Sequence, residues 1–144
     1  MPSPQAKHFL LATEDTEHTE DLFVGDPLTE QIIGAAIEVH RLLGPGLLES
    51  IYEEALCHEL TLRGIEFEHQ VEVNVMYKGH VIKGQRIDVL VEQEVIIELK
   101  SVSRLPEVAK AQTLSYLKAT RLKRALLINF GENRLVDGIT RLSL

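Results

Sequence analysis

Two acidic residues and a lysine lie around a predicted β-hairpin, at positions that suit metal-assisted chemistry. If residues 92–94 form the turn, the flanking strands pair so that Asp88 lies directly opposite Glu98. Opposed residues of an antiparallel pair have Cβ atoms about 4.5–5.5 Å apart. Lys100 is two residues beyond Glu98 and is therefore expected on the same face. The other face is expected to be apolar, formed by Ile87, Val89, Val91, Val95, Ile97 and Leu99.

Two facing carboxylates need a counter-charge. Like charges directly opposite each other destabilise a sheet, and burying them without a partner costs far more. A divalent cation such as Mg²⁺ removes this cost, because it is bound by one or two carboxylates together with substrate phosphate. The alternative is a local set of ion pairs, in which Lys100 and Arg86 neutralise Asp88 and Glu98. The spacing alone does not distinguish the two interpretations.

Two further pairs of polar residues lie on predicted helices. Glu49 and Tyr52 are about one turn apart in the pattern Gly46-x-x-Glu49-x-x-Tyr52, so they share a helix face. Gln112 and Tyr116 are likewise one turn apart, on the helix after the Glu-x-Lys strand. Each pair alone is typical of a solvated or half-buried helix face. Together with the basic last third of the chain, they favour the metal-site interpretation.

Hydrophobic periodicity predicts the elements that position these residues. Apolar residues recur at helical spacing, or a proline opens a helix, over three ranges: 28–43, 47–63 and 106–119. Strands are predicted where apolar residues alternate or run together, at 67–77, 80–92, 95–100 and 124–130, with an edge strand at 135–142. Gly84 marks a bulge, and the continuous apolar run at 95–100 predicts a central strand covered on both faces. The order α-α-β-β-β-α-β-(β) predicts an α/β domain with a mixed sheet flanked by helices.

The net charge of −7 is unevenly distributed along the chain. Residues 1–27 carry six acids and one base, and this acidic, low-complexity segment is expected to be a disordered tail. The domain is expected to occupy 28–144, with Asp26 capping its first helix and Pro27 at the first helical position. Residues 100–144 carry nine bases and three acids. The acidic total therefore does not exclude a polyanionic partner.

Composition excludes several function classes. No apolar run approaches the roughly 18–20 residues that span a bilayer, so no membrane partner is expected. Cys57 is the single cysteine, which suits a reducing cytoplasm, and it is expected to be a packed thiol rather than a nucleophile. The histidines lack zinc-site spacing, since Leu62 stands where a second ligand to His58-Glu59 would be needed. The absence of Trp argues against a glycosidase, and the absence of a Gly-rich Lys loop argues against NTP hydrolysis.

With these motifs the chain resembles the bacterial GxxExxY proteins of the PD-(D/E)XK nuclease superfamily. The resemblance covers about residues 28–142, through the motif Gly46-x-x-Glu49-x-x-Tyr52 and also through His40-Arg41-x-Leu43-Gly44-Pro45-Gly46 and Asn129-Phe130-Gly131. It implies a restriction-endonuclease-like core in which Asp88 is the first acid and Glu98-Leu99-Lys100 is the Glu-x-Lys motif. Gln112-x-x-x-Tyr116 is similar to the Gln-x-x-x-Tyr motif of the RecB-like branch. The proline that usually precedes the first acid is replaced by Ile87.

The resemblance implies a metal-dependent hydrolysis of phosphodiester bonds in DNA or RNA. Asp88 and Glu98 would bind Mg²⁺ or Mn²⁺, with the backbone carbonyl of Leu99 as a third ligand and Glu49 reaching the ion directly or through water. Because two carboxylates stabilise the ammonium of Lys100, its expected role is to position the attacking water rather than to act as an unassisted base. The side chains expected to orient the substrate are those of Tyr52, Gln112 and Tyr116. Bases that could contact phosphates, or simply form a solvated face, are Lys110, Lys118, Arg121, Lys123 and Arg124.

An alternative function is a non-catalytic module that binds nucleic acid or protein on the same scaffold. The sequence does not distinguish DNA from RNA, or internal cutting from cutting at an end. A domain of this size leaves little room for reading base sequence, so specificity is expected to come from a protein partner or an oligomer. His40 precedes Glu49 on the neighbouring helix, and a core or capping role is favoured for it over a role in the site.

Overall fold

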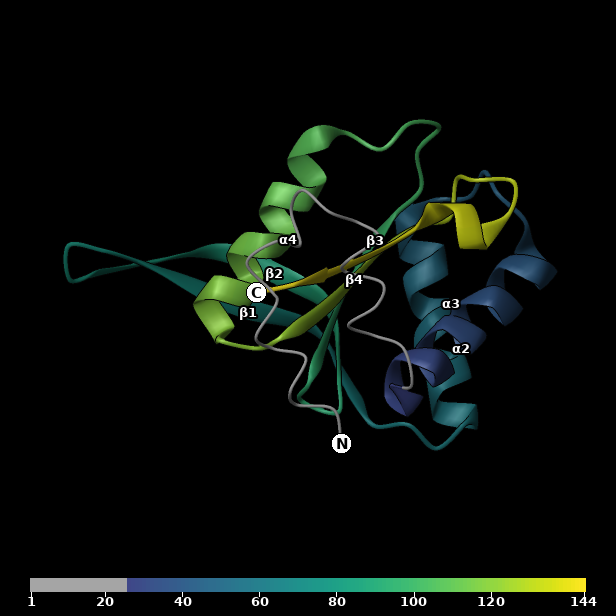
Figure 1. Cartoon of the computed structure of the whole chain (residues 1–144), viewed down its shortest axis with the longest axis horizontal. Coiled ribbons are helices and arrows are strands. Elements are labelled where there is room, and N and C mark those ends of the chain that lie inside the picture. Colours follow the sequence, from purple (N-terminus) through teal and green to yellow (C-terminus); the bar gives the residue numbers. More distant parts are fainter. Residues whose placement is uncertain (1–25) are drawn as a thin grey trace.

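The computed structural model describes residues 26–144 (Figure 1). The expected tail, residues 1–27, lies outside the described residues except for its last two. The helices and strands follow the predicted order: α2 (Pro27–Leu43), α3 (Glu49–Leu62), β1 (Phe67–Tyr77), β2 (His80–Val91), β3 (Val95–Lys100), α4 (Glu107–Thr120), β4 (Arg124–Asn129), the 3₁₀ helix η2 (Leu135–Gly138) and β5 (Ile139–Ser143). Within residues 26–144, none of the helices has the length and apolar character that crossing a membrane requires.

The sheet is mixed and has five strands in the order β1-β2-β3-β4-β5. Only β3 and β4 are parallel, and the other neighbours pair antiparallel. β3 is therefore the central strand, and its residues Val95–Leu99 are all buried. This confirms the prediction from its continuous apolar run, because a strand between two helical layers has no face in water.

Helices cover both faces of the sheet. α2 and α3 pack on one face and α4 packs on the other (Figure 1). α2 begins as the sequence predicts: the Asp26 carboxylate accepts the Thr29 backbone N–H at 3.3 Å, and Pro27 occupies the first turn. Arg124 forms ion pairs with both Asp26 and Glu94, so it joins the start of α2 to the β2–β3 turn. The cap and the sheet therefore hold each other in place.

The predicted edge strand at 135–142 is wrong in its first half. Residues 135–138 form η2, and β5 begins only at Ile139. The pairing of β5 with β4 stops at the pair Ile139 and Ile128. β4 ends one residue further on, at Asn129, so residues 135–137 have no β4 residue opposite them and form a short helix instead.

The predicted apolar face of the β2–β3 hairpin is correct except for Ile87. Val89 packs beneath α2 and α3, as expected, but Ile87 packs in the cluster beneath α4. The register places Gln70 of β1 opposite Asp88, between these two levels. Gln70 has a left-handed φ of 54°. The β1–β2 ribbon therefore turns at the level of Asp88: Val89 points toward α2 and α3, whereas Ile87 points toward α4.

Beyond that level, β1 and β2 continue as a two-stranded arm, residues 73–86, which projects from the body of the molecule (Figure 1). Every residue from Asn74 to Gly84 is exposed. The register shifts by one residue between Val73 and Val75, with the extra residue on β2 beside Gly84, whose φ is 125°. This confirms the predicted bulge, because such a conformation is open to glycine at little cost.

Candidate functional site

The hairpin brings Asp88 and Glu98 together as the sequence predicts. Val91 pairs with Val95, and the last backbone pair before the two acids joins Val89 to Ile97. Beyond that pair, the hydrogen bonds between β2 and β3 run from backbone N–H groups to carboxylate side chains. The Asp88 N–H donates to Oε2 of Glu98 at 2.9 Å.

A second hydrogen bond runs the other way across the same pair of strands. The Leu99 N–H donates to Oδ2 of Asp88 at 2.8 Å. The other oxygen of each carboxylate, Oδ1 of Asp88 and Oε1 of Glu98, has no hydrogen-bond partner within residues 26–144. Each acid is therefore fixed by one oxygen and offers the other to a ligand.

Partial or full burial opposes the ionisation of both carboxylates, since Asp88 is half-buried and Glu98 is buried. Glu98 is only 5% exposed. Its desolvation, and then the charge of Asp88, raise the pKa of Glu98 to about 8. The pKa of Asp88 is also raised, mainly by desolvation and further by the charges of Glu53 and Glu49, while the Leu99 N–H opposes the shift. The site is therefore short of positive charge.

No basic side chain neutralises the two acids directly. Within residues 26–144, neither Lys100 nor Arg86 lies within 4.0 Å of a carboxylate oxygen of Asp88 or Glu98. The alternative interpretation, a local set of ion pairs, is therefore not what the structure shows. Lys100 acts only through space, lowering the pKa of both acids.

Helix α3 places two acids near Asp88, of which the sequence predicted one. Glu49 is exposed and is the first residue of α3. Glu53, one turn further on, raises the pKa of Asp88 more than Glu49 does. Its carboxylate accepts the Gln70 side-chain amide at 3.0 Å. Sequence reasoning missed Glu53 and Gln70, although the i, i+4 spacing of Glu49 and Glu53 already put both acids on one helix face.

Helix α4 contributes Tyr116 on the other side of the site. Tyr116 is 2% exposed, and its hydroxyl accepts the Arg86 backbone N–H. Desolvation, followed by the charges of Glu98 and Asp88, raises the pKa of Tyr116, so the phenol keeps its proton. Gln112, one turn earlier, is half-buried, and its side-chain amide has no hydrogen-bond partner within residues 26–144.

Tyr52 has a position that does not fit the expected contact with substrate. It is fully buried and stacks on Phe130, with ring centroids 4.5 Å apart. Its hydroxyl donates to the Gly44 carbonyl and accepts the Leu47 N–H at 3.2 Å. Tyr52 therefore closes the loop that precedes Glu49, because both hydrogen-bonding functions of its hydroxyl are already used.

The segment after Lys100 is held by a loop that follows β4. The Asn129 side chain accepts the Val102 N–H and donates to the Val102 carbonyl, each at 3.0 Å. Gly131 lies against the backbone of Val102, and a Cβ at position 131 would be 2.1 Å from the Val102 carbonyl oxygen. Ser101 donates to the Leu47 carbonyl and so joins this segment to the start of α3. These contacts account for the Asn129-Phe130-Gly131 motif.

His40 has the core role that the sequence favoured. It is buried, its Nε2 lies 2.8 Å from the Glu132 carbonyl oxygen, and its ring lies 6.1 Å from that of Phe130. Cys57 is half-buried among apolar residues, and desolvation raises the pKa of its thiol to about 11. Neither side chain supplies a nucleophile to the site.

The predicted phosphate-contacting bases are not equivalent. Arg124 is committed to Asp26 and Glu94, so the structure does not leave it available for phosphate. Lys118 and Arg121 are exposed at the end of α4, and Lys110 is half-buried on the same helix.

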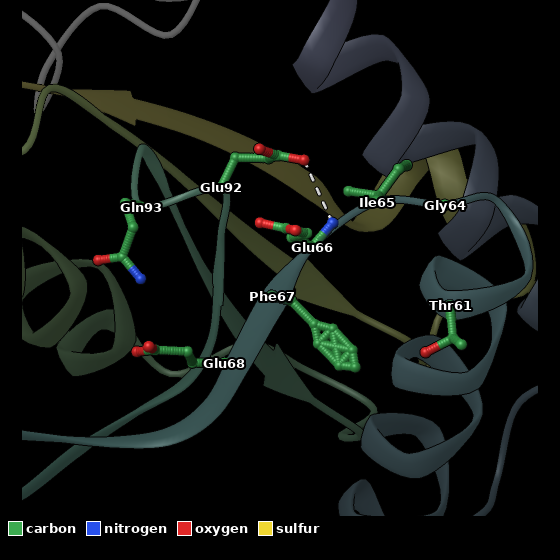
Figure 2. A pocket seen from close by; sticks show the side chains of 8 residues that line it. All are labelled: Thr61, Gly64, Ile65, Glu66, Phe67, Glu68, Glu92 and Gln93. Atoms are coloured by element: carbon green, nitrogen blue, oxygen red, sulfur yellow. Dashed lines mark hydrogen bonds between the residues drawn. The ribbon is translucent and has the colours of Figure 1, made fainter.

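A shallow groove lies at the other end of α3, between that helix, β1 and the β2–β3 turn (Figure 2). Its charged lining residues are all acidic: Glu66, Glu68 and Glu92. One of them, Glu92, accepts the Glu66 backbone N–H at 3.2 Å. This groove contains none of the predicted site residues, and its charge does not suit a polyanion.

The donor set at Asp88 and Glu98 fits a hard divalent cation. Within residues 26–144, no three His, Cys, Asp or Glu side chains are grouped so that they could hold a metal. A structural zinc site, which needs four nitrogen or sulfur ligands, is therefore not formed by the described residues. Mg²⁺ keeps several waters and uses one or two carboxylates, which is what this pair offers.

Comparison with known proteins identifies a family. The sequence model described as the PD-(D/E)XK nuclease superfamily matches residues 26–142. No match to the chain was found among curated proteins or among solved structures. The matched range covers the described elements from α2 to β5 except the last residue of β5, with Asp88 and the Glu-x-Lys motif inside it. The chain therefore belongs to the PD-(D/E)XK nuclease superfamily.

Proposed function

We propose that this protein is a metal-dependent nuclease that hydrolyses phosphodiester bonds of DNA or RNA. The observation that carries the proposal is the pair of half-buried Asp88 and buried Glu98, which the described residues leave without a cation within 4.0 Å. Such a pair is costly unless a ligand compensates it. Because the chain belongs to a nuclease superfamily, we infer that this ligand is a divalent cation that assists phosphodiester hydrolysis.

Within this superfamily, we assign the chain to the GxxExxY proteins of the RecB-like branch. Support comes from Gly46-x-x-Glu49-x-x-Tyr52, whose tyrosine closes the loop before Glu49. Gln112 and Tyr116 provide further support, because they lie on α4 beside the acids.

The residues that would hold Mg²⁺ or Mn²⁺ are Asp88, Glu98 and the backbone carbonyl of Leu99, with Glu49 acting through water. A divalent cation bound there supplies an activated water and stabilises the charge that develops on the phosphate. In the reaction, the water oxygen would lose a proton to solvent and bond to phosphorus, the bond to the leaving sugar oxygen would break, and that oxygen would take up a proton from solvent.

The remaining side chains orient the reactants. Lys100 lies at the end of β3, half-buried, and its ammonium would hold the attacked phosphate and the water. Gln112 has a free amide for a substrate group. Tyr116 keeps its proton because its pKa is raised, so it would donate a hydrogen bond. Tyr52 is a positioning residue for Glu49 rather than a substrate contact, since its hydroxyl is already occupied.

The proposal is tested by cleavage assays on labelled single- and double-stranded DNA and RNA, with Mg²⁺, Mn²⁺ or EDTA. Asp88→Asn and Lys100→Gln remove a carboxylate charge and the ammonium, and Asp137→Asn, at an exposed position of η2, is a matched control. We expect cleavage that needs metal, is lost in the first two variants and is retained in the control. Cleavage that persists in both site variants would overturn the assignment.

A non-catalytic binding module is the second candidate. The observation that favours it is that the described residues provide only two close carboxylates and no third protein ligand of that kind. Binding of nucleic acid without cleavage under any metal condition would support this candidate. For either function we propose the cytoplasm as the compartment, because the single cysteine has no internal disulfide partner.

A further inference from the structure

The side chains of the arm formed by residues 73–86 have no role in the site described above, yet the surface of the arm is unusual. It carries three bases, Lys78, Lys83 and Arg86, and no acidic residue. The base of this arm lies beneath α4, where Val73 packs in one cluster with Leu114 and Leu117. A basic arm therefore projects from a chain whose net charge is −7.

Apolar side chains are also exposed along this arm. Their exposed fractions run from 40% to 62%, for Val75, Met76, Tyr77, Val81 and Ile82. Val75 pairs with Ile82, and Met76 pairs with Val81, so apolar residues occupy both faces of the ribbon. Exposed apolar residues gathered beside basic residues are typical of a binding surface.

The arm is continuous with the candidate metal site. β2 runs from the arm through Arg86 directly to Asp88. At about 3.3 Å per residue, the turn at Gly79 lies about 30 Å from Asp88, close to the length of one turn of B-DNA. A ligand that follows the arm would therefore reach the two carboxylates.

We propose that the β1–β2 arm grips double-stranded DNA by lying in a groove of the duplex, and that it presents the duplex to Asp88 and Glu98. This inference rests on the proposed function and names its substrate class. The major groove admits a two-stranded β-ribbon. Lys78 and Lys83 contact phosphates, and the exposed apolar residues pack against base edges or between base steps.

Other ligands fit the arm less well. Single strands are bound on several aromatic platforms, and the arm has one aromatic residue, Tyr77. The major groove of A-form RNA is too deep and narrow for side chains to read. A second copy of the chain would meet the same patch across a two-fold axis. That contact would bring the like charges of Lys78 and Lys83 together.

Binding is measured by fluorescence anisotropy on the full chain in EDTA, so that no cleavage occurs. The probes are a DNA duplex of about two helical turns, one of its single strands, and an RNA duplex of the same sequence. Lys78→Ser/Lys83→Ser removes two exposed arm charges. Arg41→Ser/Arg134→Ser removes two exposed charges far along the chain from the arm and serves as the control.

We expect the wild type to prefer the DNA duplex. Each phosphate contact contributes roughly 0.9 to the slope of log affinity against log salt, so the arm variant should reduce this slope by about 2. The control should leave the slope unchanged. An unchanged slope in the arm variant, or a preference for either of the other probes, would overturn the proposal.

Two further measurements cover the remaining outcomes. Hydrogen exchange of the backbone amides in the arm should slow when the duplex is added to the wild type. This measurement does not depend on any variant folding correctly. Val75→Ser/Ile82→Ser should weaken duplex binding without changing the sedimentation of the free protein. If it instead converts a dimer to a monomer and leaves duplex affinity unchanged, the arm is a self-association surface and the proposal is wrong.

These results are separable from the proposed function. Metal-dependent cleavage that is lost in Asp88→Asn, together with an unchanged salt slope in Lys78→Ser/Lys83→Ser, would refute the DNA-binding role of the arm. It would still support the proposed nuclease activity. Arm-dependent duplex binding without cleavage under any metal condition would refute the proposed nuclease activity. It would still support the arm as a DNA-binding surface.

Discussion

Replacing Glu98 with glutamine should stabilise the metal-free protein at pH 8 and above. Burial and the charge of Asp88 raise the pKa of Glu98 from 4.5 to about 8. In the unfolded chain Glu98 loses its proton near its ordinary pKa, whereas in the folded protein it keeps the proton until about pH 8. Between these two values the unfolded state binds fewer protons, so the stability of the wild type falls as pH rises.

The size of this effect follows from the shift. One pH unit corresponds to about 1.4 kcal/mol, so the change from 4.5 to about 8 sets an upper limit of about 5 kcal/mol. Glu98→Gln cannot ionise, and it retains an oxygen that can accept the Asp88 N–H. For a domain of this size each kcal/mol moves Tm by about 4 °C, so the variant should melt higher than the wild type at pH 8, by at most about 20 °C.

The assay is thermal unfolding in EDTA at intervals from pH 4.5 to 9. Wild type and Glu98→Gln should converge near pH 4.5, separate as pH rises, and run parallel above pH 8. Glu68→Gln, at an exposed site on β1, is the control and should follow the wild type throughout. A difference between wild type and Glu98→Gln that stays constant over the whole range would refute the reasoning that Glu98 is buried without a counter-charge.

Three further changes test other parts of the site. Mg²⁺ at about 100 times its Kd should stabilise the wild type by about 2.7 kcal/mol, and Asp88→Asn should abolish this gain in the same melting assay. Tyr52→Phe loses both hydroxyl hydrogen bonds and should lower the free energy of unfolding in denaturant by about 1–3 kcal/mol; no change would show that the loop before Glu49 is held by other contacts. Gly131→Ala should lower Tm strongly, because its Cβ would lie 2.1 Å from a backbone oxygen. Gly34→Ala in α2 meets only a flexible arginine side chain and should be neutral or stabilising by up to about 1 kcal/mol; equal effects at the two glycines would contradict the close approach at Gly131.

Local pattern predicted the elements well because each has a strong signal of its own. The Asp26-Pro27 cap, the turn at 92–94 and the bulge at Gly84 each depend on residues within a few positions of one another. The register of the β2–β3 hairpin followed from the turn length alone, and it placed Asp88 beside Glu98.

The sequence by itself therefore determined the fold class, the strand order around the hairpin and the pairing of the two acids. It did so because alternation and turn length fix which residues face each other across neighbouring strands. Resemblance then supplied Glu49 and the residues on α4 as partners of that pair.

Only the tertiary structure decided what surrounds the acids. Lys100 shares their face in the sequence pattern, yet it forms no ion pair with them within the described residues, because that depends on side-chain placement in three dimensions. Tyr52 has the spacing of a site residue, but its ring packs on Phe130 from a distant strand end, and this contact buries it. The charge deficit at Glu98 likewise arises from burial beneath other elements, which no local pattern records.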